Sequence, residues 1–245
     1  MDKRKNPETN SIASSLVSRI LYEDNHIVVV NKMPSEIVQG DKTGDLPMSD
    51  LLKAYIGQKY NKPGNVFLGV VHRIDRPVSG AVAFARTSKA LTRLNEMLKQ
   101  HELRKKYWAV VKKCPDPPKG ILVHYLQKNE KQNKSYPVAE NTPGSKRAEL
   151  HYGVLGQSRD YFLLEVELIT GRHHQVRSQL AALGCPIKGD LKYGFDRSNP
   201  NGSIHLHARN ISFLHPVKKE QITITAPAPK DPLWNFFEKE FGSTK

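Results

Sequence analysis

The sequence predicts an α+β protein, because many short strand-like runs are joined by few helix-like segments. Runs rich in β-branched and aromatic residues recur along most of the chain, as at 27–30, 107–111, 161–168 and 221–225. Amphipathic helix spacing occurs near 51–56, 90–98, 172–183 and 233–237. We see no internal repeat and no clear domain boundary. We therefore expect residues 1–19 to form a flexible basic and polar arm, and residues 20–245 a single domain.

The first half of this domain combines a hairpin, a helix and two strands around a turn. Runs 20–22 and 27–30 flank a polar turn and predict the hairpin. The helix near 51–56 is expected to end at Gly57. Apolar runs at 67–70 and 81–85 enclose the polar turn, and Thr87 or Ser88 can cap the helix that follows.

The second half continues with strands around one further helix. Residues 127–145 are polar and lysine-containing and have no periodicity, so we expect a long loop there. A helix is expected to start near Arg172 and to stop at Gly184. A second hairpin is predicted from strands at 147–155 and 161–168. Two later strands are predicted at 205–213 and 221–225. A short terminal helix is predicted at 233–237.

The charge of the chain restricts the kind of partner. A formal net charge of +14 over 245 residues favours RNA, DNA or an anionic membrane face, the alternative being a generally basic solvated surface. Two cysteines exclude a disulfide framework and fit a reducing compartment. No apolar run approaches the roughly 20 residues that span a bilayer, and the N-terminus lacks an apolar signal segment. We expect a cytoplasmic protein.

The stretch 71–80, VHRIDRPVSG, is the most distinctive in the chain. It places one carboxylate, Asp75, between Arg73 and Arg76 on a turn that Pro77 stiffens. Such a cationic setting favours an ionised aspartate that can act as a nucleophile. The alternative reading from spacing alone is a surface turn with mixed charges.

A second polar stretch, 170–177, reads TGRHHQVR. On a helix, Arg172 and Arg177 would lie about 140° apart, near an N-terminus that favours anions. Cations there are unfavourable without an anionic partner, which argues for a ligand. The set His173, His174, His205, His207 and Cys185 has no recognised metal-ligand spacing, so we expect no metal. No phosphate-binding glycine loop is present.

Residues 72–80 resemble the signature of the RluA-type pseudouridine synthases, H-R-L-D-x-x-T-S-G, with Ile74 in place of Leu and Val78 in place of Thr. Further family-like segments follow in the family's order, and the resemblance covers roughly residues 20–231. These segments lie at 20–32, 38–40, 106–109, 171–177, 183–190, 193–194, 207–208 and 215–216. Several separate motifs in order are more specific than any one of them.

The resemblance implies a mixed, largely antiparallel bent sheet flanked by helices, with the active-site cleft across it. It implies that Asp75 is the catalytic aspartate, that Tyr107 stacks on the target base and that Arg177 pairs with the aspartate. The resemblance further suggests that residues of the same two motifs bind the RNA or the flipped base: Arg73, which enters the RNA stack, and His72, Arg76, Arg172, His174 and Gln175.

The implied reaction is the isomerisation of uridine to pseudouridine in RNA. The bond from uracil N1 to ribose C1′ breaks, the uracil rotates, and C5 bonds to C1′. Neither redox chemistry nor phosphate transfer occurs, so no cofactor is expected. Asp75 either attacks C1′ or removes a 2′ proton to give a glycal, and the sequence leaves both routes open. Tyr107 is a candidate to assist the final proton transfer from C5.

Ribosomal RNA is the expected substrate, with transfer RNA as the alternative. Only about 19 residues precede the first predicted strand, so we expect no N-terminal S4-type domain. Lys128, Lys131 and Lys134 are candidates for salt-dependent RNA affinity. We expect a monomer without an obligate protein partner. Two other functions compete: a non-catalytic RNA-binding or ribosome-assembly protein with the same fold, and an enzyme for free nucleotides, which the charge disfavours.

Overall fold

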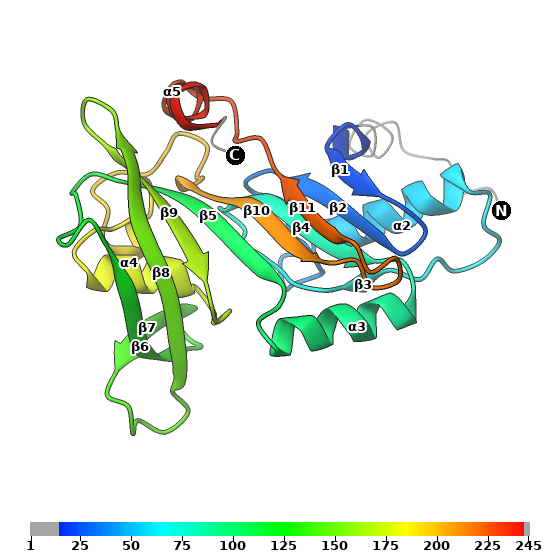
Figure 1. Cartoon of the computed structure of the whole chain (residues 1–245), viewed down its shortest axis with the longest axis horizontal. Coiled ribbons are helices and arrows are strands. Elements are labelled where there is room, and N and C mark those ends of the chain that lie inside the picture. Colours follow the sequence, from blue (N-terminus) through cyan, green and yellow to red (C-terminus); the bar gives the residue numbers. More distant parts are fainter. Residues whose placement is uncertain (1–14, 243–245) are drawn as a thin grey trace.

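The computed structural model describes residues 15–242, and one continuous sheet of 11 strands runs through them. Its hydrogen-bonded order is β1-β2-β4-β10-β5-β9-β8-β6-β7, with β11 beside β10 and β3 beside β4. Neighbouring strands are antiparallel except β4 and β10, which are parallel. Figure 1 shows that the sheet is bent, since β6, β8 and β9 stand across the direction of β2, β4 and β10. The predicted α+β class with a mixed, largely antiparallel bent sheet is confirmed.

The strands are β1 (Ile20–Glu23), β2 (Ile27–Lys32), β3 (Gly69–Val70), β4 (Ser79–Ala85), β5 (Arg104–Val111), β6 (Lys119–Asn129), β7 (Lys134–Val138), β8 (Lys146–Gln157), β9 (Phe162–Leu168), β10 (Leu206–Leu214) and β11 (Gln221–Thr225). The helices are α2 (Met48–Lys59), α3 (Ser88–Lys99), α4 (Gln175–Ala182), the 3₁₀ turn η1 (Leu191–Tyr193) and α5 (Pro232–Phe241).

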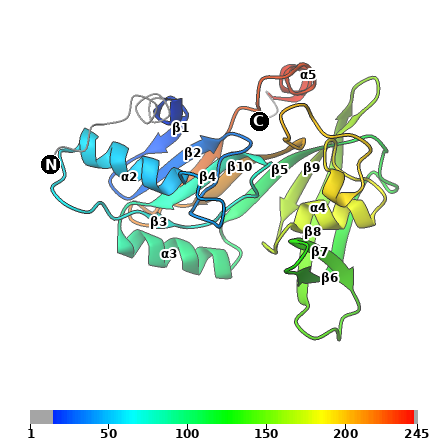
Figure 2. The same cartoon turned by 180° about the vertical axis from the view of Figure 1, so that it is seen from behind.

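The first half of the sheet is covered on both faces. Because successive side chains of a strand point to opposite faces, β2 contributes to two separate apolar clusters. One face packs on α2 through Val28, Val30, Leu52 and Ile56. The other packs on α3 through Ile27, Val29, Ala90 and Leu94. Figures 1 and 2 show the two helices on opposite sides of β2 and β4. Every residue of β2 and β4 is buried as a result.

Gly80 allows β4 and β10 to approach each other closely. Its φ is +120°, and a Cβ at this position would lie 2.4 Å from the carbonyl oxygen of Ala208. No other residue type fits such a contact. The pairing of β4 with β10 fixes the start of β4, and therefore fixes the preceding loop, residues 71–78, at the middle of the sheet.

The predicted long loop at 127–145 is wrong. Most of this segment belongs to the hairpin of β6 and β7, which pairs Tyr125 with Val138 and Asn129 with Lys134. Figure 1 shows that this hairpin lies at one end of the sheet. Strands that project toward solvent need little apolar alternation, so the sequence carried no strand pattern there.

Two predicted helix boundaries are also wrong. Gly57 lies inside α2, which continues to Lys59, so this glycine does not end the helix. Arg172 lies outside α4, which begins at Gln175 after His174 adopts a left-handed conformation. The helical angle expected between Arg172 and Arg177 therefore does not apply. Thr87, in contrast, caps α3 as predicted by accepting a hydrogen bond from the Ala90 amide.

The predicted arm, residues 1–19, lies mostly outside the described residues. Of its last part, Leu16 is fully buried in the cluster that packs on α2, and Arg19 binds Glu36 at 2.6 Å. The packed body therefore extends at least to the beginning of the described range. Within residues 15–242, no helix is long and apolar enough to cross a membrane.

Candidate active site

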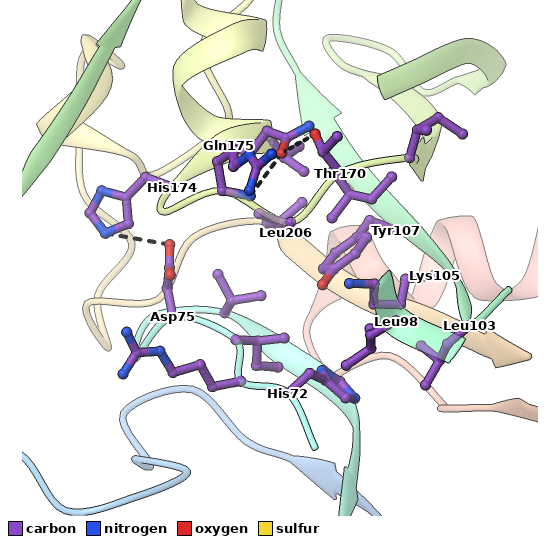
Figure 3. Close-up of a pocket in the computed structure, with 18 of the residues that line it drawn as sticks. His72, Asp75, Leu98, Leu103, Lys105, Tyr107, Thr170, His174, Gln175 and Leu206 are labelled. Atoms are coloured by element: carbon purple, nitrogen blue, oxygen red, sulfur yellow. Dashed lines mark hydrogen bonds and ion pairs between the residues drawn. The ribbon is translucent and has the colours of Figure 1, made fainter. Parts of the chain in front are cut away.

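A cavity of about 590 Å³ opens beside the loop formed by residues 71–78. Four parts of the chain line it: this loop, the segment from the end of α3 into β5, the segment from the end of β9 into α4, and Leu206 at the start of β10. These parts are far apart in sequence and meet because β4, β10, β5 and β9 are neighbours in the sheet. Figure 3 shows the side chains that project into the cavity from these elements.

Asp75 is held in the cavity by one of its two oxygens. Arg177 donates a hydrogen bond from Nη1 to Oδ2 of Asp75 at 3.0 Å. His174 Nε2 lies 3.5 Å from the same oxygen. Among the described residues, no donor binds Oδ1. The carboxylate is oriented on one side and open on the other.

Arg177 is itself fixed by Asp190. Its Nε and Nη2 donate to the two oxygens of Asp190 at 2.7 and 2.9 Å, in the two-point geometry that guanidinium and carboxylate favour. Both side chains are buried. Burial by itself would lower the pKa of Arg177, but Asp190 and Asp75 outweigh that effect and raise it. Arg177 is therefore a permanent, immobile cation next to Asp75.

His174 contributes an uncharged ring to the site. Burial, together with the charge of Arg177, lowers its pKa to about 2, so the ring is neutral near pH 7. Its Nδ1 lies 3.0 Å from the Tyr193 hydroxyl. The Tyr193 hydroxyl also donates to the Ser135 carbonyl oxygen at 3.2 Å and accepts from the Ser135 amide at 2.9 Å. His174 is thereby tied through Tyr193 to the start of β7.

A buried lysine stabilises the loop that carries Asp75 by hydrogen bonds to its backbone carbonyls. Lys32 Nζ donates to the carbonyl oxygens of Asp75, Arg76 and Val78 at 3.2, 3.0 and 2.6 Å, and to that of Met33 at 3.1 Å. The side chain is fully buried, and burial lowers its pKa to about 7, although the nearby carboxylates of Glu36 and Asp75 oppose this shift. One side chain thus satisfies the carbonyls of a loop that has no strand partner there.

Tyr107 lies on β5 and lines the same cavity. The side chain is buried, and burial raises the pKa of its hydroxyl, with a further contribution from the negative charge of Asp75. The Tyr107 hydroxyl is therefore protonated at neutral pH. Figure 3 shows the ring across the cavity from Asp75.

The other predicted site residues divide into two groups. Arg73 and Arg172 are exposed and line the cavity, and Arg172 Nε donates to the Arg147 carbonyl at 2.9 Å. Arg76 is not part of the lining, since it binds the Ser35 carbonyl at 3.1 Å and pairs with Asp45.

His72 and Gln175 line the cavity but are engaged in internal hydrogen bonds. His72 Nε2 accepts from the Ala83 amide at 3.2 Å, and its other ring nitrogen, Nδ1, is buried without a partner. Gln175 Oε1 accepts from the Thr170 hydroxyl at 2.8 Å, while its Nε2 donates to the Glu149 carbonyl at 3.0 Å. Gln175 therefore ties the start of α4 to the end of β9.

Four residues that shape the site had no predicted role: Lys32, Lys105, Asp190 and Tyr193. Lys32, Asp190 and Tyr193 belong to family-like segments, which were the available signal for them. Nothing in the local sequence links Asp190 to Arg177 or Tyr193 to His174. Of the histidines weighed as metal ligands, His174 lies in the site beside Asp75. His207 lies elsewhere and contacts the Ser79 hydroxyl at 2.9 Å and the Ala226 carbonyl at 3.0 Å. Residues 15–242 contain no group of three or more side chains arranged to hold a metal ion.

Comparison with known proteins agrees with this geometry. The profile of the RNA pseudouridylate synthase family matches residues 26–182. The chain belongs to this family. The RNA pseudouridine synthase is 32% identical over 236 residues to ribosomal large subunit pseudouridine synthase C of Buchnera aphidicola subsp. Baizongia pistaciae, covering 92% of this chain and 72% of that protein. It is also 32% identical over 236 residues to ribosomal large subunit pseudouridine synthase D of Xylella fastidiosa, covering 91% and 70%.

A solved structure supports the fold of this synthase. Human RNA pseudouridylate synthase domain containing 4 superimposes with a TM-score of 0.76, covering 95% of this chain and 96% of that one, at 23% identity. The predicted family, fold class and isomerase activity on RNA are confirmed. The alternative of a non-catalytic protein with the same fold is not favoured.

Proposed function

We propose that this synthase isomerises uridine in ribosomal large-subunit RNA and that Asp75 performs the central step. The observation that carries the proposal is the asymmetry of Asp75, a residue of the cavity lining whose Oδ2 is bound by Arg177 while no residue in the described range 15–242 donates to Oδ1. An oriented carboxylate with one open oxygen can attack a carbon or accept a proton. Two relatives that share about a third of their residues with this chain are named for the large ribosomal subunit.

The target uridine must leave its RNA stack to reach Asp75, because the carboxylate lies in a cavity and not on a flat surface. The exposed guanidinium groups of Arg73 and Arg172 at this cavity can bind phosphates or fill the space that the base vacates. The Tyr107 ring offers a face on which the extruded uracil can stack. The net charge of +14 supplies affinity for RNA that is independent of sequence.

In the reaction, the electron pair of the C1′–N1 bond departs with the uracil. Oδ1 of Asp75 either bonds to C1′ or takes the 2′ proton, and both routes require a carboxylate fixed in place. Arg177 fixes it and neutralises part of its charge, while Lys32 holds the loop that carries it. After rotation of the uracil, C5 bonds to C1′ as the bond from Asp75 to C1′ breaks or, in the glycal route, as Asp75 returns the proton to C2′. The C5 proton is then lost and N1 gains a proton, which leaves the Asp75 carboxylate free again. Tyr107 is the proposed relay for the C5 proton.

We further propose that the enzyme acts in the cytoplasm as a monomer. Arg177 and His174 orient Asp75 from within one chain, an arrangement that a monomer can supply.

Pseudouridine mapping by carbodiimide modification and primer extension tests the proposal. Total RNA is compared from cells with the gene, without it, with Asp75→Asn, and with Asp160→Asn, which changes an exposed aspartate outside the cavity. We expect one or more large-subunit RNA sites to vanish in the deletion and with Asp75→Asn, and to persist with Asp160→Asn. A site that persists with Asp75→Asn refutes the role of Asp75. Loss confined to transfer RNA refutes the ribosomal substrate.

A further inference from the structure

Lys105 lines the cavity but has no role in the proposed reaction steps. It lies on β5 two residues before Tyr107, so both side chains project from the same face of the strand. Its neighbour Lys106 points to the other face, where it forms an ion pair with Glu165 at 2.8 Å. Lys105 itself has no hydrogen-bond or ion-pair partner among the described residues.

Apolar side chains line the cavity near Lys105, and no described residue accepts a hydrogen bond from it. Leu98 and Leu103 form apolar walls beside it. His72 is close enough for the charge of Lys105 to help lower its pKa to about 3, after the larger effect of burial. Because His72 Nε2 accepts from the Ala83 amide, the neutral ring carries its proton on Nδ1 and cannot accept a hydrogen bond from Lys105.

The ammonium group lies close to the backbone of Gly171, since a Cβ at Gly171 would be in van der Waals contact with Lys105 Nζ at 3.4 Å. The side chain keeps some exposed surface because the cavity is open, yet burial lowers its pKa to about 8. An ammonium group kept in such a place without a partner is unfavourable until an acceptor arrives.

We propose that Lys105 is a catalytic residue that donates a hydrogen bond from Nζ to an exocyclic oxygen of the target uracil as the C1′–N1 bond breaks. This inference rests on the proposed function, in which Asp75 acts on the ribose in the same cavity. With C1′ at Asp75, the base extends into the cavity toward Tyr107 and Lys105, which Figure 3 shows on the opposite side.

The proposal assigns a defined task to this cation. When the C1′–N1 bond breaks, its electron pair leaves on N1 and is delocalised over N1, O2 and O4 of the uracil. This charge develops whether Asp75 attacks C1′ or removes the 2′ proton. A pre-oriented donor at O2 or O4 stabilises the transition state more than the ground state, and in a partly dehydrated cavity its effect is large. The charge disappears when the C5–C1′ bond forms and N1 takes up a proton.

A backbone phosphate is the competing acceptor, and the arrangement of cations argues against it. The guanidinium groups of Arg73 and Arg172 are exposed at the cavity and accessible to a phosphate chain. Lys105 instead shares its strand face with the aromatic ring of Tyr107, between apolar walls, where a flat base fits better than a hydrated phosphate.

Single-turnover kinetics with a short RNA carrying the mapped site test the proposal. The wild-type enzyme, Lys105→Met, Lys105→Arg and the matched control Lys106→Met are each compared on RNA with uridine or 5-fluorouridine at the target. Fluorine at C5 withdraws electrons and makes uracil a better leaving group, so it lessens the need for a donor. Because 5-fluorouracil has no proton to lose from C5, the rate followed on both RNAs is that of cleavage of the C1′–N1 bond. We expect Lys105→Met to lose ~100-fold or more in rate on uridine, and at least ~10-fold less on 5-fluorouridine. Lys105→Arg is expected to restore part of the rate.

RNA affinity and stability separate the proposal from other roles. We expect Lys105→Met to bind RNA within ~3-fold of wild type and to unfold at the same or a higher temperature, since it removes an unpaired buried charge. An unchanged rate, an equal loss on both RNAs, or a loss confined to affinity overturns the proposal, the last assigning Lys105 to a phosphate. Asp75→Asn is measured in parallel: if it turns over normally, the role of Asp75 fails, while the two-substrate comparison still decides that of Lys105.

Discussion

Two aspartates in this molecule, Asp24 and Asp75, differ in how many hydrogen-bond donors surround their carboxylates. Both follow a strand, both are partly buried, and both lie close to cations. Both oxygens of Asp24 are saturated: five donors surround them, from the amides of His26 and Ile27 and the side chains of Tyr22, His215 and Lys218. Asp75 has Arg177 at 3.0 Å and His174 at 3.5 Å, both on one oxygen.

The difference separates a structural carboxylate from a reactive one. Burial acts to raise the pKa of Asp24, but the hydrogen bonds from the His26 and Ile27 amides outweigh it and hold the pKa well below its usual range. Such a group stabilises the fold and has no lone pair left for chemistry. Asp75 is oriented by partners that come from outside its own loop, and it keeps an oxygen for a substrate.

The largest effect is expected from Arg177→Lys, which removes the guanidinium group that orients the reactive carboxylate of Asp75. Lysine keeps a positive charge but cannot bind Asp190 at two points and reach Asp75 as well. We expect the single-turnover rate to fall ~100-fold or more, while RNA affinity changes little. The matched control is Arg209→Lys, which alters another buried arginine, bound to Glu238 at 2.8 Å outside the cavity. Equal rate losses in both variants would contradict a role specific to the site.

A smaller effect, on stability only, is expected from Asp24→Asn. The amide retains one acceptor oxygen but loses the charge that attracts Lys218, and its nitrogen cannot accept from the backbone amides. We expect the free energy of unfolding, measured by urea denaturation, to fall by ~2 kcal/mol. The turnover rate of folded enzyme should stay within ~2-fold of wild type. A variant of normal stability and low activity would show that Asp24 is not a structural carboxylate.

The smallest effect is the pH dependence of the difference in unfolding free energy between wild type and Asp24→Asn. Because the folded-state pKa of Asp24 is depressed, its stabilisation is fully present above the unfolded pKa, near 3.8, and is lost as pH falls toward the folded value. The gap in unfolding free energy between wild type and Asp24→Asn should therefore be constant from pH 7 to about 5 and shrink below about 4. Denaturation curves at four pH values measure it. A gap that widens in acid would contradict the assignment.

The local sequence predicted the strands and helices whose side-chain pattern depends on residues close to one another in the chain. The alternation of β-branched residues located β2, β5, β9 and β11, and the Thr87 cap located α3. It failed where tertiary context decides. The hairpin of β6 and β7 has no apolar pattern because its strands project from the core, and α4 starts at Gln175 only because the preceding backbone turns left-handed at His174.

Motifs carried by short contiguous segments were enough to predict the family, the bent mixed sheet that the resemblance implies, and the candidate trio of Asp75, Tyr107 and Arg177. The partners that surround these three residues depend on contacts between segments far apart in the chain. Lys32 reaches carbonyls more than 40 residues away, and Arg177 joins Asp75 to Asp190 across 102 and 13 residues. The tertiary structure also revealed that no described residue accepts a hydrogen bond from Lys105. Hydrogen bonding and burial arise from segments distant in sequence, so no local pattern encodes them.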